Sequence, residues 1–137
     1  MHRLPFAAAA IAVLVLQSCA SVEQVIIAEP GVTFSLPIGK TAAVSGSSTR
    51  ITFREVSEDS RCPTSVVCVW QGAAKIELTV ARNGGRGEAA NLSLTPPNNE
   101  ARLGDLVVRF VGLAPYPASP DPAPRQYVAE LMISKPQ

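Results

Sequence analysis

Histidine is nearly absent from this sequence: the only one among 137 residues is His2, in an N-terminal segment typical of a cleaved export signal. A mature chain without imidazole excludes Ser-His-Asp and Cys-His catalysis, His-ligated zinc and histidine proton shuttles. A charge excess is absent as well. Once Arg3 is removed with the signal, 11 basic side chains balance 11 acidic ones, which argues against binding to nucleic acid or to an acidic membrane.

Long apolar runs are also lacking, apart from residues 6–16. This run follows a basic start and is shorter than the roughly 20 residues that a helix needs to cross a bilayer, so it indicates a secretory signal. It ends in Leu16-Gln17-Ser18-Cys19, which resembles the bacterial lipobox. The resemblance implies cleavage before Cys19 and lipidation of its thiol, and acyl chains would then hold the protein on a membrane.

This interpretation divides the chain into a lipoprotein signal peptide (1–18), a lipid-attached tether (19–31) and a single domain (32–137). Because Ala20 follows the cysteine, where lipoprotein retention in the inner membrane usually requires Asp, the resemblance implies the outer membrane, facing the periplasm. Two alternatives stay open. Ordinary signal peptidase could cut after Ala20 and release a soluble periplasmic or secreted protein, or the segment could be an uncleaved core helix.

Alternating apolar and polar residues beyond position 31 predict strands and no helix. A hairpin is expected around Asn83-Gly84-Gly85, because these residues adopt positive φ at little cost. The proline-rich residues 114–124 are expected to form a stiff surface connector. We therefore expect an all-β fold, a small antiparallel sandwich or barrel of six to seven strands, at residues 32–36, 41–44, 50–56, 74–80, 88–94, 106–113 and 126–133.

The densest cluster of distinctive residues lies between Glu58 and Gly72 and contains Cys62, Cys68 and the only tryptophan, Trp70. Exported thiols meet an oxidising environment, which favours a structural disulfide between the two cysteines. A soft-metal site that includes Met132 and a redox-active pair are alternatives, although five intervening residues and the lack of a following helix disfavour redox chemistry.

Four residues around the cysteines have expected structural or recognition roles. The Asp59 carboxylate is expected to accept backbone N–H bonds from the turn, and Arg61 to pair locally with an acidic neighbour or to recognise a carboxylate. Trp70 is expected to pack on the disulfide or the core, and Gly72 to permit close packing beside it. Glu58 and Asp59 should point to opposite faces of a strand, so they make a poor acid/base pair.

The segment Asp59-Ser60-Arg61-Cys62-Pro63, followed after four residues by Cys68-Val69-Trp70-Gln71-Gly72, is similar to a motif of small exported bacterial proteins and lipoproteins of unknown function. That family usually has Ala at the position of Gln71. The resemblance covers about fifteen residues and implies an exported β-rich domain, with no activity attached.

Three functions compete on this basis. The first is a non-enzymatic, lipid-anchored envelope protein that needs no cofactor or metal and binds or supports another envelope component. The second is an inhibitor of exported proteases that presents the disulfide-held residues 62–68 as a rigid insert. The third, an enzyme that uses carboxylates alone, is disfavoured because no second convergent acid is visible.

Overall fold

The computed structural model describes residues 24–120 and 126–136, and these residues form strands and loops. No helix in this part of the chain is long and apolar enough to cross a membrane. The strands are β1 (Ile26–Ala28), β2 (Thr33–Pro37), β3 (Thr41–Val44), β4 (Thr49–Asp59), β5 (Ala74–Arg82), β6 (Glu88–Ser93), β7 (Glu100–Leu103), β8 (Leu106–Ala114) and β9 (Val128–Ser134).

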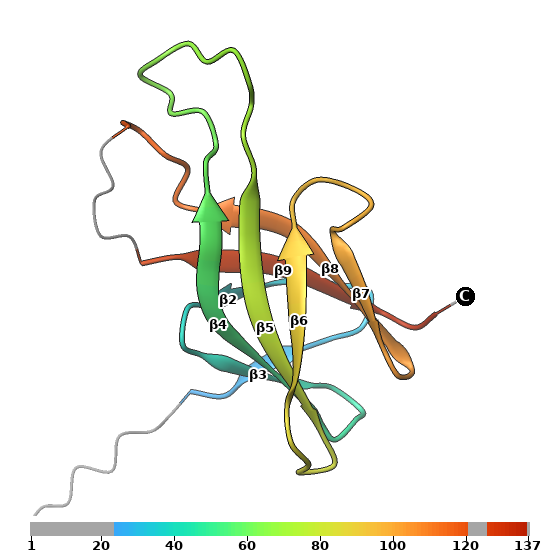
Figure 1. Cartoon of the computed structure of the whole chain (residues 1–137). Coiled ribbons are helices and arrows are strands. Elements are labelled where there is room, and N and C mark those ends of the chain that lie inside the picture. Colours follow the sequence, from blue (N-terminus) through green and yellow to red (C-terminus); the bar gives the residue numbers. More distant parts are fainter. Residues whose placement is uncertain (1–23, 121–125, 137) are drawn as a thin grey trace, which may run out of the picture.

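Two sheets build the fold, as Figure 1 shows. One has the order β1-β3-β4-β5-β6 and the other β2-β9-β8-β7. The prediction of an all-β sandwich is confirmed, but the strand number is nine rather than six or seven. The two unpredicted strands, β1 and β7, have only three and four residues, so each offers little alternation to recognise, although β3, also of four residues, was predicted.

Strand β1 also corrects two expectations. It lies at positions assigned to the tether, so the ordered fold begins before residue 32. It pairs in parallel with β3, whereas the other pairs are antiparallel, so the fold is not purely antiparallel.

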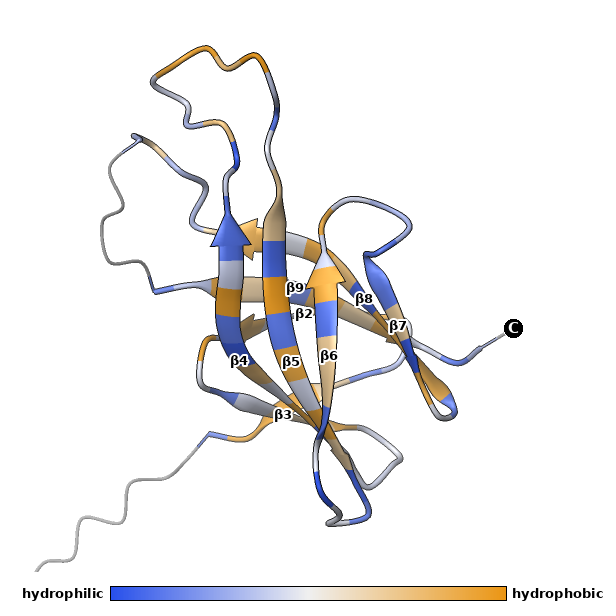
Figure 2. Ribbon diagram, viewed as in Figure 1, coloured by the Kyte–Doolittle hydropathy of each residue, from blue (hydrophilic) through white to orange (hydrophobic). Residues whose placement is uncertain are grey.

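The core lies between the two sheets and follows the period-two pattern of the sequence. On β5 the inward side chains Ala74, Ile76, Leu78 and Val80 are buried, while the residues between them are polar or half-exposed. The same alternation appears as orange and blue bands along β4, β5 and β6 in Figure 2. Phe53 and Phe110 are the largest fully buried side chains, so the strongest apolar contribution comes from the middle of the sandwich.

The long hairpin of β4 and β5 carries the segment that holds Cys62 and Cys68. Beyond the last strand pair, Asp59 with Ala74, the backbone bonds continue from Ser60 N–H to the Ala73 carbonyl and from Cys62 N–H to the Gln71 carbonyl. The base of the loop is therefore an extension of the sheet. In Figure 1 this loop, residues 60–73, projects beyond the end of the sandwich.

Candidate functional site

A buried ion pair stands at the base of this loop. The Arg61 guanidinium donates Nε to one Asp59 oxygen at 2.7 Å and Nη2 to the other at 2.9 Å, and both side chains are less than a tenth exposed. Tyr127, which directly precedes β9 of the opposite sheet, donates its hydroxyl to the same carboxylate at 2.9 Å. These bonds tie the end of β4 to the other half of the sandwich.

Other N–H groups of Arg61 bind the end of β8 and the residue that follows it. Nη1 donates to the Leu113 carbonyl at 2.6 Å and Nη2 to the Pro115 carbonyl at 3.0 Å. The guanidinium carbon lies 4.9 Å from the centre of the Tyr116 ring, a cation–π distance. One side chain thus connects β4, the start of the proline-rich segment and, through Asp59, β9. The local pairing expected of Arg61 is present. Its bonds to the carbonyls of Leu113 and Pro115, more than 50 positions away in the sequence, were not expected.

Burial by itself would raise the pKa of Asp59, but the hydrogen bonds from Arg61 and Tyr127 outweigh it and hold that pKa below its usual value. The backbone N–H of Arg61 also contributes to this lowering, so Asp59 accepts one backbone bond of the kind expected from the sequence. Its main partners, however, are side chains. Asp59 is therefore charged and its oxygens are engaged, which suits a structural role better than a catalytic one.

Cys62 and Cys68 are joined by a disulfide, with their Cα atoms 5.9 Å apart. The predicted disulfide is thus present, and while it is formed neither sulfur is a thiolate that could bind a metal ion. The loop is further attached to the proline-rich segment by a bond from Thr64 N–H to the Pro117 carbonyl at 3.0 Å. The disulfide, the sheet-like base and this contact hold the loop in one conformation.

Gly72 is required where the loop returns to the sheet. It has a φ of +69°, and a Cβ built there would lie 1.7 Å from the Ser60 carbonyl oxygen. No side chain fits that space, and L-residues rarely adopt that φ. The close packing expected of Gly72 is therefore against the backbone of Ser60 rather than against Trp70.

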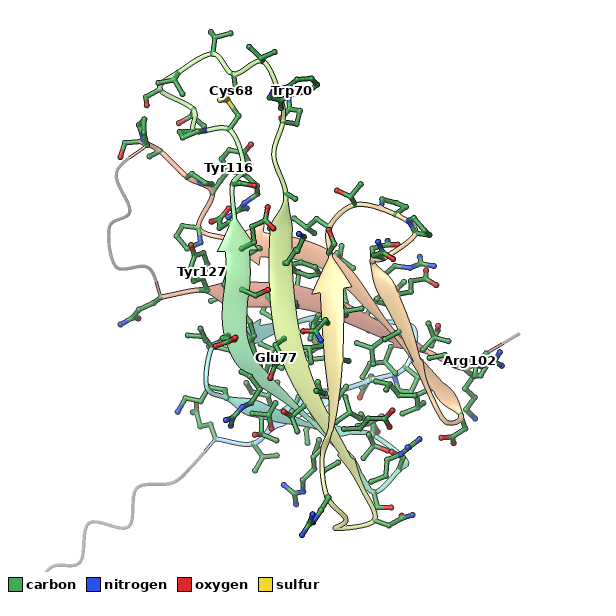
Figure 3. All side chains as sticks on the ribbon, in the orientation of Figure 1. Cys68, Trp70, Glu77, Arg102, Tyr116 and Tyr127 are labelled. Carbon is green, nitrogen blue, oxygen red and sulfur yellow. A yellow bond between two sulfur atoms is a disulfide. The ribbon has the colours of Figure 1, made fainter. Side chains whose placement is uncertain are left out.

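The tip of the loop exposes apolar side chains. Val67 and Val69 are almost entirely exposed, Trp70 is 82% exposed and Val66 is 42% exposed. The expectation that Trp70 packs on the disulfide or the core is therefore wrong, and Figure 3 shows Trp70 beside Cys68 at the outer end of the loop, away from the body of the protein. We call residues 66–70 the apolar tip. Its signal in the sequence is the absence of any charged residue between positions 62 and 72.

The arrangement offers no visible acid/base chemistry. Glu58 pairs with Lys75 and accepts a hydrogen bond from Ser60, and these contacts, with the Lys75 bond first, lower the pKa of Glu58. It shares no partner with Asp59 among these contacts, as strand alternation predicts. Among the residues that the structure describes, no three His, Cys, Asp or Glu side chains gather to hold a metal ion.

Two residues of the site were not expected as partners. Tyr127 belonged to the expected strand 126–133 and Tyr116 to the proline-rich connector, and they meet Asp59 and Arg61 only through the fold. Cys19, the expected lipidation site, lies outside the described residues. Comparisons with protein-family models, with curated proteins and with solved structures found no match for this chain.

Proposed function

We propose that this protein is a non-enzymatic exported protein, held on the cell envelope by lipid on Cys19, that binds another envelope component through the apolar tip. The single observation that supports the proposal best is the exposure of Val67, Val69 and Trp70 on a loop that a disulfide and a buried ion pair hold rigid. Exposed apolar clusters of this kind mark interaction sites, and tryptophan is among the residues that dominate binding energy.

Rigidity is the second support. A flexible loop would lose conformational entropy on binding, whereas a loop already fixed loses little. The disulfide and the Thr64 contact act within the loop and its neighbour, and Arg61 acts at its base. Of these groups only Cys68 lies within the tip, so the loop is held mainly by residues other than the exposed Val67, Val69 and Trp70.

Export and lipidation are tested by acyl labelling in a bacterial host. The parent chain should incorporate a labelled fatty acid and sediment with membranes, and Cys19→Ser should lose both properties. A conservative control is Ser18→Ala, which keeps a small residue before the cysteine and should still be labelled. An unlabelled parent chain that stays in the soluble fraction would exclude the lipid anchor.

Binding through the apolar tip is tested by a photo-crosslinking amino acid at Val67, with Val111 as the matched control. Val111 is also an exposed valine, 44% accessible, but lies on β8. Adducts should form at position 67 alone, and the purified partner should then bind Trp70→Ala about 10-fold or more weakly, the effect of losing a central aromatic contact. Adducts of equal yield at both positions, or unchanged affinity of Trp70→Ala, would exclude the tip.

The alternative function is inhibition of exported proteases by residues 62–68. One observation favours it: Val67 is fully exposed within a disulfide-closed loop, and protease inhibition also depends on a preorganised loop. The two functions respond differently to Val67→Arg. An inhibitor loop should change its target from proteases that accept small apolar residues to proteases that accept basic ones, whereas a docking tip should simply lose affinity for its partner.

A further inference from the structure

A second exposed surface lies where the described chain begins, on the opposite side of the molecule from the loop of residues 60–73. Val25 and Ile27 are 59% and 55% exposed. Next to Val25 a shallow hollow of about 350 Å³ is lined by Gln24, Val25, Lys40, Thr41, Arg50, Thr52 and Ala81. We call Val25, Ile27, Lys40 and Arg50 the anchor-side face.

The strand register explains why Val25, Ile27 and Arg50 share a face, and Lys40 joins them as a lining residue of the hollow. Ile26 pairs with Ala42, and Ala42 in turn with Ile51. Ala42 and Ile51 are buried, and Ile26 packs against the core. Neighbouring residues on each strand point the other way, so Val25 and Ile27 face outward together with Arg50.

The positive charge of this face comes from Lys40 and Arg50. Neither Lys40 nor Arg50 forms an ion pair with any residue in the described part of the chain. Of the carboxylates near this face, Glu55 and Glu77 are paired with each other in the register farther along β4 toward the loop, and Glu29 lies one residue beyond the end of β1. The even charge balance of the whole chain therefore conceals a local surface that is apolar and basic.

The short chain between Cys19 and Gln24 indicates that a lipid bilayer would contact this face. Only five peptide bonds separate Cys19 from Gln24, and a fully extended chain of five residues spans at most about 18 Å. If Cys19 carries lipid, the anchor-side face cannot lie far from the bilayer surface. Exposed valine and isoleucine suit the boundary of the hydrocarbon, and Lys40 and Arg50 suit lipid phosphates.

We propose that the anchor-side face docks on an anionic phospholipid bilayer and orients the protein on its membrane. The inference rests on the proposed lipid anchor at Cys19. It has a consequence for the apolar tip. Thr52, which lines the hollow, pairs with Thr79, and Asp59 pairs with Ala74, five residues or about 17 Å along β5; the loop extends beyond that point. Docking would therefore direct the tip away from the bilayer, toward a partner, as the opposite positions in Figure 1 indicate.

Tryptophan fluorescence offers a direct test, because the chain has a single tryptophan. The mature chain from residue 19 is attached through the Cys19 thiol, the one cysteine outside the disulfide, to a maleimide phospholipid in vesicles with brominated acyl chains. The native Trp70 should remain unquenched. In the variant Val25→Trp with Trp70→Phe, fluorescence should be lost on vesicles that contain phosphatidylglycerol.

The charges are tested by adding Lys40→Gln and Arg50→Gln to that variant. Each basic residue near an anionic surface favours binding by a factor of about five, so the docked orientation should become about 30-fold less favourable and quenching should disappear. The matched control is Arg102→Gln, an exposed arginine on β7 in the other sheet, which should leave quenching unchanged.

Several results would overturn the inference. The first is quenching of Trp70 and not of the tryptophan at position 25. The second is equal quenching on neutral and anionic vesicles. The third is self-association without lipid that buries position 25, which would show that a second copy of the chain covers this face. Because the maleimide tether does not depend on acylation in the cell, failure of acyl labelling counts against the proposed function alone. Failure of quenching counts against the docking face alone.

Discussion

Replacing Arg61 by alanine should be among the most destabilising single changes outside the apolar core. The substitution removes the partner of a buried carboxylate and leaves the Leu113 carbonyl without its 2.6 Å donor. Removing one member of a buried ion pair costs about 3–5 kcal/mol, because the other charge stays buried without compensation. The Tyr127 hydroxyl keeps one bond to Asp59, so we expect a value toward the lower end of this range.

The assay is urea unfolding of residues 20–137, followed by circular dichroism, with the free energy of unfolding extrapolated to water. Arg61→Lys should lose about 1–3 kcal/mol, because an ammonium group keeps the charge but cannot make the two parallel bonds to Asp59 and also reach both carbonyls. The control Arg102→Ala, at an exposed position on β7, should change stability by less than about 0.5 kcal/mol.

Coupling within the pair gives a second measurement. If Arg61 and Asp59 act as one unit, the double variant Asp59→Ala with Arg61→Ala should lose clearly less stability than the sum of the two single losses. A loss below about 1 kcal/mol for Arg61→Ala, or strict additivity in the double variant, would refute the assignment of this pair as the connection between the sheets.

Three further predictions follow from the same region. Replacing Cys62 and Cys68 together by alanine should lower the free energy of unfolding by about 2–4 kcal/mol with the strand spectrum retained, and thiol titration of the native exported domain should find neither cysteine free. Gly72→Ala should lower the free energy of unfolding by more than about 2 kcal/mol, because the new Cβ would overlap the backbone of Ser60. The control Gly46→Ala has a similar φ of +72° but open space around it, so it should lose only about 1 kcal/mol. Equal losses would contradict the close approach at Gly72. The pKa of Asp59 is lower in the folded state than in the unfolded state, so the stability that its charge contributes is present above about pH 4 and is lost as pH falls through the folded pKa. The free energy of unfolding, measured at decreasing pH, should show this loss in the parent chain and not in Asp59→Asn.

Local patterns in the sequence were sufficient for the fold class, the long strands and the disulfide. The inward residues of β5 alternate without interruption, so a strand with one buried face follows from the period of two alone. The bond between Cys62 and Cys68 was expected because they are the two cysteines within the folded domain and lie six positions apart. The hairpin at residues 83–85 follows from glycine and asparagine chemistry, and Asn83 indeed has a positive φ of 51°.

Features that depend on residues distant in the sequence were decided only by the tertiary structure. Tyr127 reaches Asp59 across 68 positions, and no local pattern encodes that contact. The parallel pairing of β1 required the whole first sheet, because three residues cannot specify a partner. Trp70 shows the same limit: its size predicts burial, but burial needs a neighbouring surface, and the loop projects beyond the sheets that could have supplied one.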